Sequence, residues 1–186
     1  MLNNEPKLLK DVLLYENGHI RRTKHILMVY SLAKSISSEE GLSLEQQQIV
    51  QSAAILHDIA IKKCKRKYND ASIEKQKLEC IPIAKKFLKA CNYVPSYTEK
   101  ILDLIYHHHD YDTFKGIEHQ VLIEADLIVN CLENKSHKEK ASDVAVHFHT
   151  KTGKELLHKL MENKDVPAFT SLCDTGQETD HFCSIY

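Results

Sequence analysis

The sequence predicts an all-α protein with a single domain, and three observations support this prediction. The 186 residues contain only five glycines and four prolines, so the signals that interrupt helices are sparse. Apolar residues recur at helical spacing along most of the chain, whereas the alternation typical of strands is missing. Hydrophobic residues make up 42% and charged residues 27%, which is the balance of a globular domain with a sizeable core.

Helical periodicity divides the chain into segments separated by short breaks. We expect helices at 6–16, 20–37, 43–60, 71–91, 96–109, 117–134, 137–149 and 152–163. The third begins with a capping box, because Ser43 is followed three residues later by Gln46. The pattern stops after residue 163, so we expect one helical domain at 1–163 and a weakly ordered tail at 164–186.

Apolar stripes show which side of four of these helices faces the core. In chain order the stripes contain Met28, Val29, Leu32 and Ile36, then Ile49, Val50, Ala53 and Ala54, then Ile101, Leu104 and Ile105, and finally Leu122, Ile123 and Val129. The basic run KKCKRK at 62–67 has no comparable stripe. We therefore expect a solvated loop there.

The composition limits the classes of function. A formal net charge of −1 and a pI near 6.9 argue against a general nucleic-acid or membrane-surface binder. No apolar run reaches the roughly 20 residues of a membrane span, and the N-terminus lacks the pattern of a signal peptide. The six cysteines are scattered without a C-x-x-C pair. We expect a cytoplasmic protein with reduced thiols, and no pattern indicates its oligomeric state.

Two polar residues interrupt the apolar stretch SAAILHDIAI at 52–61. A carboxylate among apolar neighbours is costly unless it is paired, hydrogen-bonded or bound to a metal. His57 and Asp58 are adjacent, so on a helix they point about 100° apart and reach one centre only if the helix ends or bends there. An aspartate that caps the next segment beside a packed histidine explains the pair equally well.

His25 and Asp126 also lie on apolar stripes. His25 is followed by Met28 at helical spacing and therefore faces inward, although such a histidine is more often a hydrogen-bonded core residue than a ligand. Asp126 follows Leu122 by four residues and precedes Val129 by three, so its carboxylate faces the same way. A buried Arg or Lys would explain Asp126, but none is evident in the neighbouring helices. Two histidines and two carboxylates from three helices make a reasonable site for a divalent transition metal.

Three consecutive histidines, His107, His108 and His109, end the helix expected at 96–109. Protonated histidine is favourable at a helix C-terminus because of the macrodipole, which explains the run without any ligand. Three consecutive residues span most of a turn, however, so at least one of them faces the core side. The run is therefore also an indication of metal binding.

The ordered set His25, His57–Asp58 and Asp126 resembles the HD-domain superfamily of metal-dependent phosphohydrolases, whose pattern is H…HD…D. The resemblance spans residues 20–163 and includes flanking motifs of one bacterial subgroup. These motifs are ILHDI, RKY, E-x-x-P-I-A at 79–84, HHH-x-YD at 107–112, EADLIVN, and TKTGKELL at 150–157. The resemblance implies an HD-type helical bundle in which the four residues bind a divalent metal.

The resemblance also implies roles for residues outside this set. Members with two metals use further histidines between the doublet and the last aspartate; one such position holds Glu79 here, and the other falls at His107 or His108. A second metal or a water-orienting role is implied for these three residues. The lysine that many members have shortly after HD is out of place, since position 61 is Ile. The cations that remain for the substrate phosphate are Arg22, Lys62, Arg66 and Lys67.

The activity that the resemblance implies is hydrolysis of a phosphate ester of a nucleotide or a similar small molecule. The cofactor would be Mn²⁺, Fe²⁺, Co²⁺, Ni²⁺ or Zn²⁺, and a second ion, Mg²⁺ included, is an open alternative. Asp58 would ligate the metal and accept a proton from an activated water, while His107 and His108 would steady the phosphate or the leaving oxygen.

Two other functions stay open. A few families with this fold carry two irons and cleave C–C or C–P bonds with oxygen, although Glu79 in place of a histidine counts against this function. The other is a nucleotide-sensing or structural HD-fold protein without turnover. Intact ligands at all four positions of the pattern argue against the second alternative.

Overall fold

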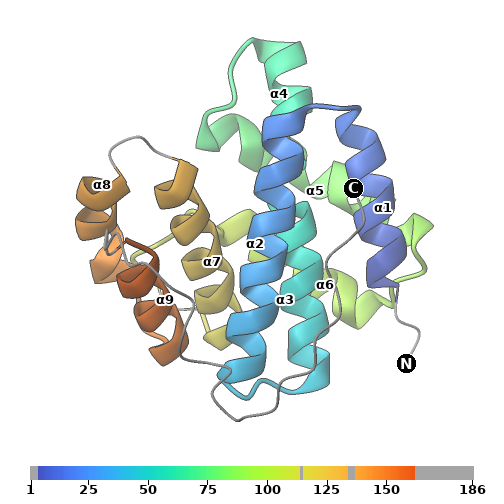
Figure 1. The fold of residues 1–186 in the computed structure, drawn as a ribbon. Helices are drawn as coiled ribbons and strands as arrows, with labels where there is room; N and C mark the ends of the chain where they lie inside the picture. The colour runs from blue at the N-terminus through green and yellow to red at the C-terminus, as the bar shows by residue number, and fades with distance from the viewer. Residues whose placement is uncertain (1–3, 114, 134–136, 162–186) are drawn as a thin grey trace, which may run out of the picture.

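The computed structural model describes residues 4–113, 115–133 and 137–161, apart from the side chains at 137–140 and 161. The regular structure in these ranges is helical, which confirms the predicted all-α fold (Figure 1). The helices are α1 (Glu5–Glu16), α2 (Ile20–Glu39), α3 (Leu44–Leu56), α4 (Ile61–Tyr68), α5 (Ile73–Ala90), α6 (Pro95–His107), α7 (Ile117–Glu133), α8 (His137–Val144), the short 3-10 helix η1 (Ala145–His147) and α9 (Lys151–Met161). The tail expected at 164–186 lies outside the described residues.

The expected helices correspond to those of the structure with one correction. The helix expected at 43–60 ends at Leu56, and the basic run at 62–67 forms α4, so the expectation of a loop there was wrong. The helical pattern of 62–67 is hard to recognise in the sequence, because most of its side chains are basic and the residue that α4 buries is a cysteine and not an aliphatic residue. The Cys64 thiol donates to the carbonyl oxygen of Lys75 at 3.3 Å, which fixes α4 against the start of α5.

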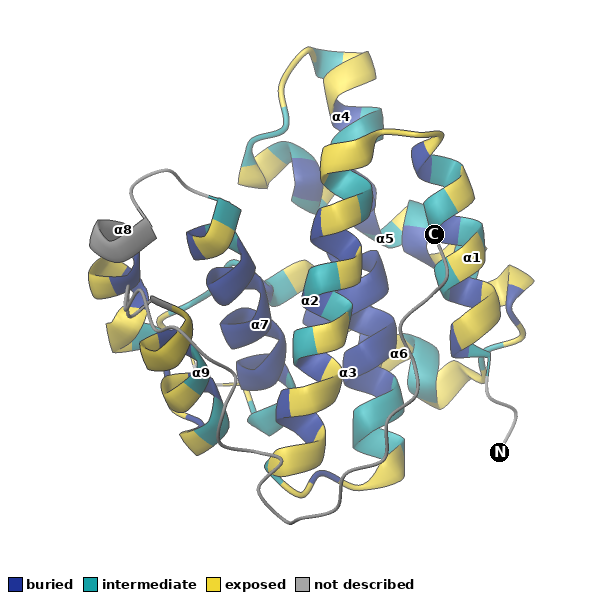
Figure 2. Cartoon of the chain, viewed as in Figure 1, coloured by how far each residue is buried: buried dark blue, intermediate teal, exposed yellow. Residues whose placement is uncertain are grey.

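The centre of the molecule consists of α2, α3 and α7 (Figure 1). α2 makes its most extensive contacts with the other two. Residues 119–129 of α7 and 49–56 of α3 are all buried, as the dark blue of these helices shows in Figure 2. None of the described helices has the length and apolar composition that crossing a bilayer requires. Because these parts of α3 and α7 are buried, a charged side chain on either of them needs a partner inside the protein.

Glu124 is fully buried on α7 and ties α9 to the centre. Its carboxylate accepts hydrogen bonds from the backbone N–H groups of His149 at 2.6 Å and Thr150 at 2.9 Å. The Thr150 hydroxyl and the Gln120 side chain also donate to it. Gly153, in the first turn of α9, lies against the same carboxylate. The TKTG sequence thus has a structural role here, because only a residue without a Cβ lets α9 approach Glu124 so closely.

Gly153→Ala should lower the free energy of unfolding by about 2 kcal/mol or more. A Cβ at this position would overlap Oε2 of Glu124 and lie 2.7 Å from Oγ1 of Thr150, so α9 would have to move. Thermal denaturation measures the loss. The neighbouring exposed residue provides a control, since Lys154→Ala should change stability by less than about 0.5 kcal/mol. Equal midpoints for the two variants would contradict the close contact.

Candidate metal centre

Four side chains from the three central helices converge at one point. His25 comes from α2, Asp126 from α7, and His57 and Asp58 from the end of α3. His25 Nε2 lies 3.2 Å from His57 Nε2 and 3.1 Å from Asp126 Oδ1. Asp58 Oδ2 is 3.7 Å from His25 Nε2 and 3.6 Å from His57 Nε2. The structure therefore brings to one point the four residues that the sequence predicts as ligands.

The end of α3 explains how two adjacent residues reach one centre. The amide of Ile59 donates to the carbonyl oxygen of Leu56 at 3.0 Å, and the amide of Ile61 donates to that of Asp58 at 3.1 Å. These bonds turn the chain between α3 and α4. His57 and Asp58 are thus not held 100° apart as they would be inside a regular helix of about 3.6 residues per turn.

The second ring nitrogen of each histidine faces a hydrogen-bond acceptor. His57 Nδ1 is 2.8 Å from the carbonyl oxygen of Ala54, which can only accept, so this nitrogen carries the proton. His25 Nδ1 faces the carboxylate of Glu133, at the end of α7, at 3.4 Å. Both Nε2 atoms consequently face the centre and can offer it a lone pair once they are deprotonated, as in histidines that bind metals.

Burial makes this arrangement depend on a cation. The side chains of His57 and Asp126 are 1% and 3% exposed, and carboxylate oxygens and ring lone pairs that face one another away from water repel. Burial lowers the pKa of His57, but Asp58 and Asp126 together raise it to about 9. Burial raises the pKa of Asp126, but hydrogen bonds from His25 and His57 hold it far below its usual range. The centre therefore needs a proton or a metal ion, and the donor set fits a divalent transition metal.

His108 and His109 form a second group of potential ligands through Asp58. His108 Nδ1 donates to the carbonyl oxygen of Ile105 at 2.6 Å, and its Nε2 lies 3.9 Å from Asp58 Oδ1. This Nε2 is buried and has no hydrogen-bond partner among the described residues. Burial and the neighbouring His109 lower the pKa of His108 to about 4, so its ring is neutral at pH 7. Asp58, His108 and His109 each offer a ligand atom within 4.8 Å of the others.

His107 belongs to a different set of contacts. Its Nδ1 lies 2.5 Å from Asp110 Oδ2, and its Nε2 lies 3.6 Å from Asp103 Oδ1. Asp110 also accepts from Lys77 at 2.8 Å, and the contacts with His107 and Lys77 lower its pKa to about 2. Within the described part of the chain, His107 is in neither group of clustered ligands. The histidines of this run that could bind a metal are thus His108 and His109.

Glu79 also lies outside both groups found among the described residues. Its carboxylate oxygens bind the Nζ atoms of Lys63 at 2.5 Å and Lys67 at 2.8 Å, and the Tyr68 hydroxyl donates to it at 2.7 Å. These three contacts lower the pKa of Glu79 to about 2. Glu79 therefore joins α5 to α4, in the region where the sequence predicts a loop.

A cavity of about 430 Å³ lies beside His25 and Asp58. Of the cations predicted to contact a substrate phosphate, Arg22 lines it. Lys62 and Lys67 have other partners: the first donates to the carbonyl oxygen of Tyr15, and the second binds Glu79. The fourth, Arg66, is exposed on α4 and is not a lining residue.

Two further cations line the cavity and were missed by sequence reasoning. Arg21 lies in the first turn of α2, and Lys65 lies one turn after Ile61 on α4. Helical spacing relates Lys65 to Ile61, but this signal becomes visible only when the basic run is recognised as a helix. Arg21 is 79% exposed and carries no pattern that distinguishes it from a surface residue.

Comparison with known proteins gives one match. A family model described as HD domain matches residues 22–131, a span that contains His25, His57, Asp58 and Asp126. No curated protein and no solved structure matches the chain.

The affinity of the centre for a divalent metal should increase about tenfold per pH unit between pH 6.5 and 8.5. The pKa of His57 in the metal-free protein is raised to about 9, so below this pH a proton on His57 must leave before a metal binds. Above pH 9 the increase should stop. Competition with a metal-ion indicator, using Mn²⁺ in buffers of matched ionic strength, measures the slope. An affinity that is constant from pH 7 to 8.5 would contradict the protonated state of His57.

Glu79→Gln should lower the free energy of unfolding at pH 7 by about 1 kcal/mol, because Lys63 and Lys67 lose their carboxylate. The pKa of Glu79 is lowered from 4.5 to about 2 by folding, so its contribution is present above pH 4.5 and is lost as the pH falls towards 2. The variant should therefore lose less stability than the wild type over this range. Urea denaturation at pH 7 and pH 3 measures both losses, and the exposed Glu74→Gln on α5 is the control. Equal losses in variant and wild type would refute the assignment.

Proposed function

The chain belongs to the HD domain family, and from this membership we propose that it is a metal-dependent phosphohydrolase that acts on a small-molecule phosphate ester. The observation that carries the proposal is the convergence of His25, His57, Asp58 and Asp126, with the second ring nitrogens of both histidines facing acceptors. Such a buried set of nitrogen and oxygen ligands is typical of a catalytic metal site. Because the set is nearly all buried but borders a cavity, it also has access to a substrate.

His25, His57, Asp58 and Asp126 would hold a divalent ion, and their mixture of imidazole and carboxylate suits Mn²⁺, Fe²⁺, Co²⁺, Ni²⁺ or Zn²⁺. When bound, such an ion supplies a water molecule of lowered pKa and polarises the phosphoryl oxygen of the substrate.

Asp58 is the residue of this set that is best placed to move a proton. Its side chain is 20% exposed, against 10% for His25 and 3% for Asp126, and it lines the cavity. Its two oxygens face different groups, Oδ2 towards the two ligand histidines and Oδ1 towards His108. We assign to Asp58 the acceptance of a proton from the attacking water.

His108 would act as a ligand and not as a proton donor. Its Nδ1 proton is used by the carbonyl oxygen of Ile105, and its lowered pKa leaves Nε2 with a lone pair at pH 7. With His109 and the second oxygen of Asp58, it would hold a second ion. Two imidazoles in this group favour a transition metal over Mg²⁺, which prefers oxygen ligands.

The same two groups, joined by Asp58, support a second candidate function. A pair of irons held by His25 and His57 on one side and by His108 and His109 on the other would suit an oxygenase. Iron content and oxygen consumption by the purified protein distinguish this activity from hydrolysis, which consumes no oxygen.

Asp58→Ala should lose its bound metal and lower phosphatase activity about 100-fold or more, because it removes a shared ligand and the proton acceptor. Elemental analysis and a panel of phosphate esters, assayed with each metal added back, measure both effects. The matched control is Asp112→Asn, since the Asp112 side chain is 95% exposed and should leave both values unchanged. Full metal content together with full activity in Asp58→Ala would rule out the assignment. Full activity of the metal-depleted wild type would rule out the mechanism.

A further inference from the structure

The cavity beside the metal centre is shaped by elements at three places in the chain. Arg22 and His25 line it from the first part of α2, Lys65 from α4, and Glu133 from the end of α7. His25 and Asp58 belong both to the centre and to the wall of the cavity. A molecule bound in the cavity would thus place one end against the centre.

Arg22 is held in the cavity wall by a buried acid. Glu16, the last residue of α1, is 2% exposed, and its carboxylate accepts a hydrogen bond from Arg22 Nε. The Arg22 side chain is itself only 17% exposed. Since Glu16 takes Nε, the two terminal nitrogens of the guanidinium have no acceptor among the described residues. Arg22 precedes His25 by one turn of α2, and both residues line the cavity.

A fixed guanidinium with free terminal nitrogens is suited to a phosphate. Arginine binds phosphate oxygens through parallel N–H donors, and the interaction is stronger when the side chain is already ordered. Lys65 and Arg21 add two positive charges to the same cavity. The carboxylates of Asp58 and Glu133 also line the cavity, and Glu133 is already in contact with His25 and Arg21. The three cations therefore outnumber the two carboxylates of the lining, and a divalent ion bound by His25 and Asp58 would add to the attraction for an anion.

The rest of the lining indicates what is attached to the phosphate. None of the ten lining residues is Phe, Tyr or Trp, and the aliphatic ones are Ile61 and Ala71. Nucleobases are usually held by stacking on aromatic rings, and the rings of this lining are limited to His25, a predicted metal ligand, and His19, so the surface available to a base is small. Asn130 and His19 supply hydrogen-bonding groups instead. Such groups recognise hydroxyls.

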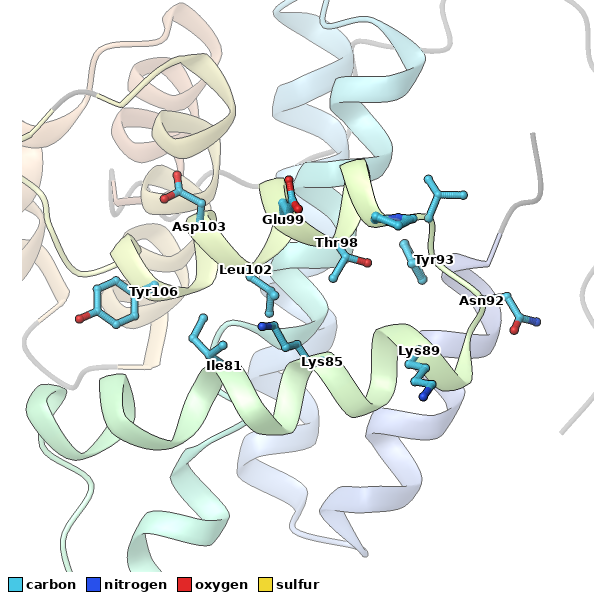
Figure 3. Close-up of a pocket in the computed structure, with 12 residues that line it drawn as sticks. Ile81, Lys85, Lys89, Asn92, Tyr93, Thr98, Glu99, Leu102, Asp103 and Tyr106 are labelled. Atoms are coloured by element: carbon cyan, nitrogen blue, oxygen red, sulfur yellow. The ribbon is translucent and has the colours of Figure 1, made fainter.

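A larger groove elsewhere in the molecule does not compete for this role. It has a volume of about 930 Å³ and lies between α5 and α6, with Tyr93, Leu102 and Tyr106 among its lining residues (Figure 3). No residue of the metal centre lines it. A phosphate bound there would therefore not reach the centre.

We propose that the cavity beside the metal centre binds the phosphate monoester of a small hydroxylated compound, such as a sugar phosphate, with Arg22 on the phosphate and Glu16 as the residue that positions Arg22. This inference rests on the proposed hydrolase function and narrows its substrate class. Glu16 lies before residues 22–131, so the match to the HD domain family does not account for it.

The first experiment tests the phosphate contact on the metal-loaded full chain. Arg22→Gln should raise KM for the substrate, and weaken inhibition by inorganic phosphate, about tenfold or more, since a charge-assisted hydrogen bond is lost. Glu16→Gln should shift both values in the same direction by about threefold to tenfold, with kcat changed less than KM and with unchanged metal content. The control is Lys24→Gln on an exposed part of α2, which should match the wild type. Unchanged KM and phosphate inhibition in both variants would overturn the role of Arg22.

The second experiment tests the substrate class. Hexose, pentose and glycerol phosphates should be hydrolysed with at least about tenfold higher kcat/KM than nucleoside 5′-monophosphates. Equal or better hydrolysis of the nucleotides would overturn the inference and leave the hydrolase function intact.

If the metal-loaded protein hydrolyses no ester, the hydrolase function fails. Calorimetric binding of inorganic phosphate then tests separately whether the cavity is a phosphate site. Binding that Arg22→Gln and Glu16→Gln weaken would support the phosphate site. Binding that neither variant changes would overturn it.

Discussion

Two imidazole nitrogens of His25 and His57 face each other at 3.2 Å, next to the carboxylates of Asp58 and Asp126, in a nearly dry interior. The carbonyl oxygen of Ala54 takes the Nδ1 proton of His57, so the two carboxylates and the facing nitrogens have fewer protons than acceptors. A positive charge, either a second proton on His57 or a metal ion, removes the remaining repulsion between these acceptors. The three central helices are arranged so that their buried faces supply these acceptors at one point, and the rest of the fold holds these helices together.

Much of this centre could be predicted because helical spacing relates sequence to burial. Asp126 and His25 could be identified as inward-facing from the apolar residues that share their stripes, and both are buried in the structure. The same reasoning does not identify Glu124, which lies two residues before Asp126 and is fully buried. α7 is buried on all sides, so it has no outward face, and spacing alone cannot show where a polar side chain on it finds its partner.

The remaining differences between the predicted and the observed site arise where a helix ends or where the sequence does not show the neighbouring helix. His107 is the last residue of α6, and the two histidines that follow have left the helix, so helical spacing could not show which of the three faces Asp58. Glu79 resembles a ligand in the motif but is neutralised by lysines of α4. That outcome depends on the tertiary position of a short helix whose only buried residue, among those described, is Cys64. Tertiary contacts of this kind have no local signature.

The pair formed by Glu16 and Arg22 connects α1 to a centre to which α1 contributes no ligand. The residues that would carry out the reaction come from α2, α3, α7 and the end of α6, whereas the anchor for Arg22 comes from a helix that precedes the region matched by the family. The guanidinium of Arg22 thus lies within the matched region, while the carboxylate that orders it lies outside. A chain with a different first helix would keep all four predicted metal ligands and lose the carboxylate that holds Arg22 in place.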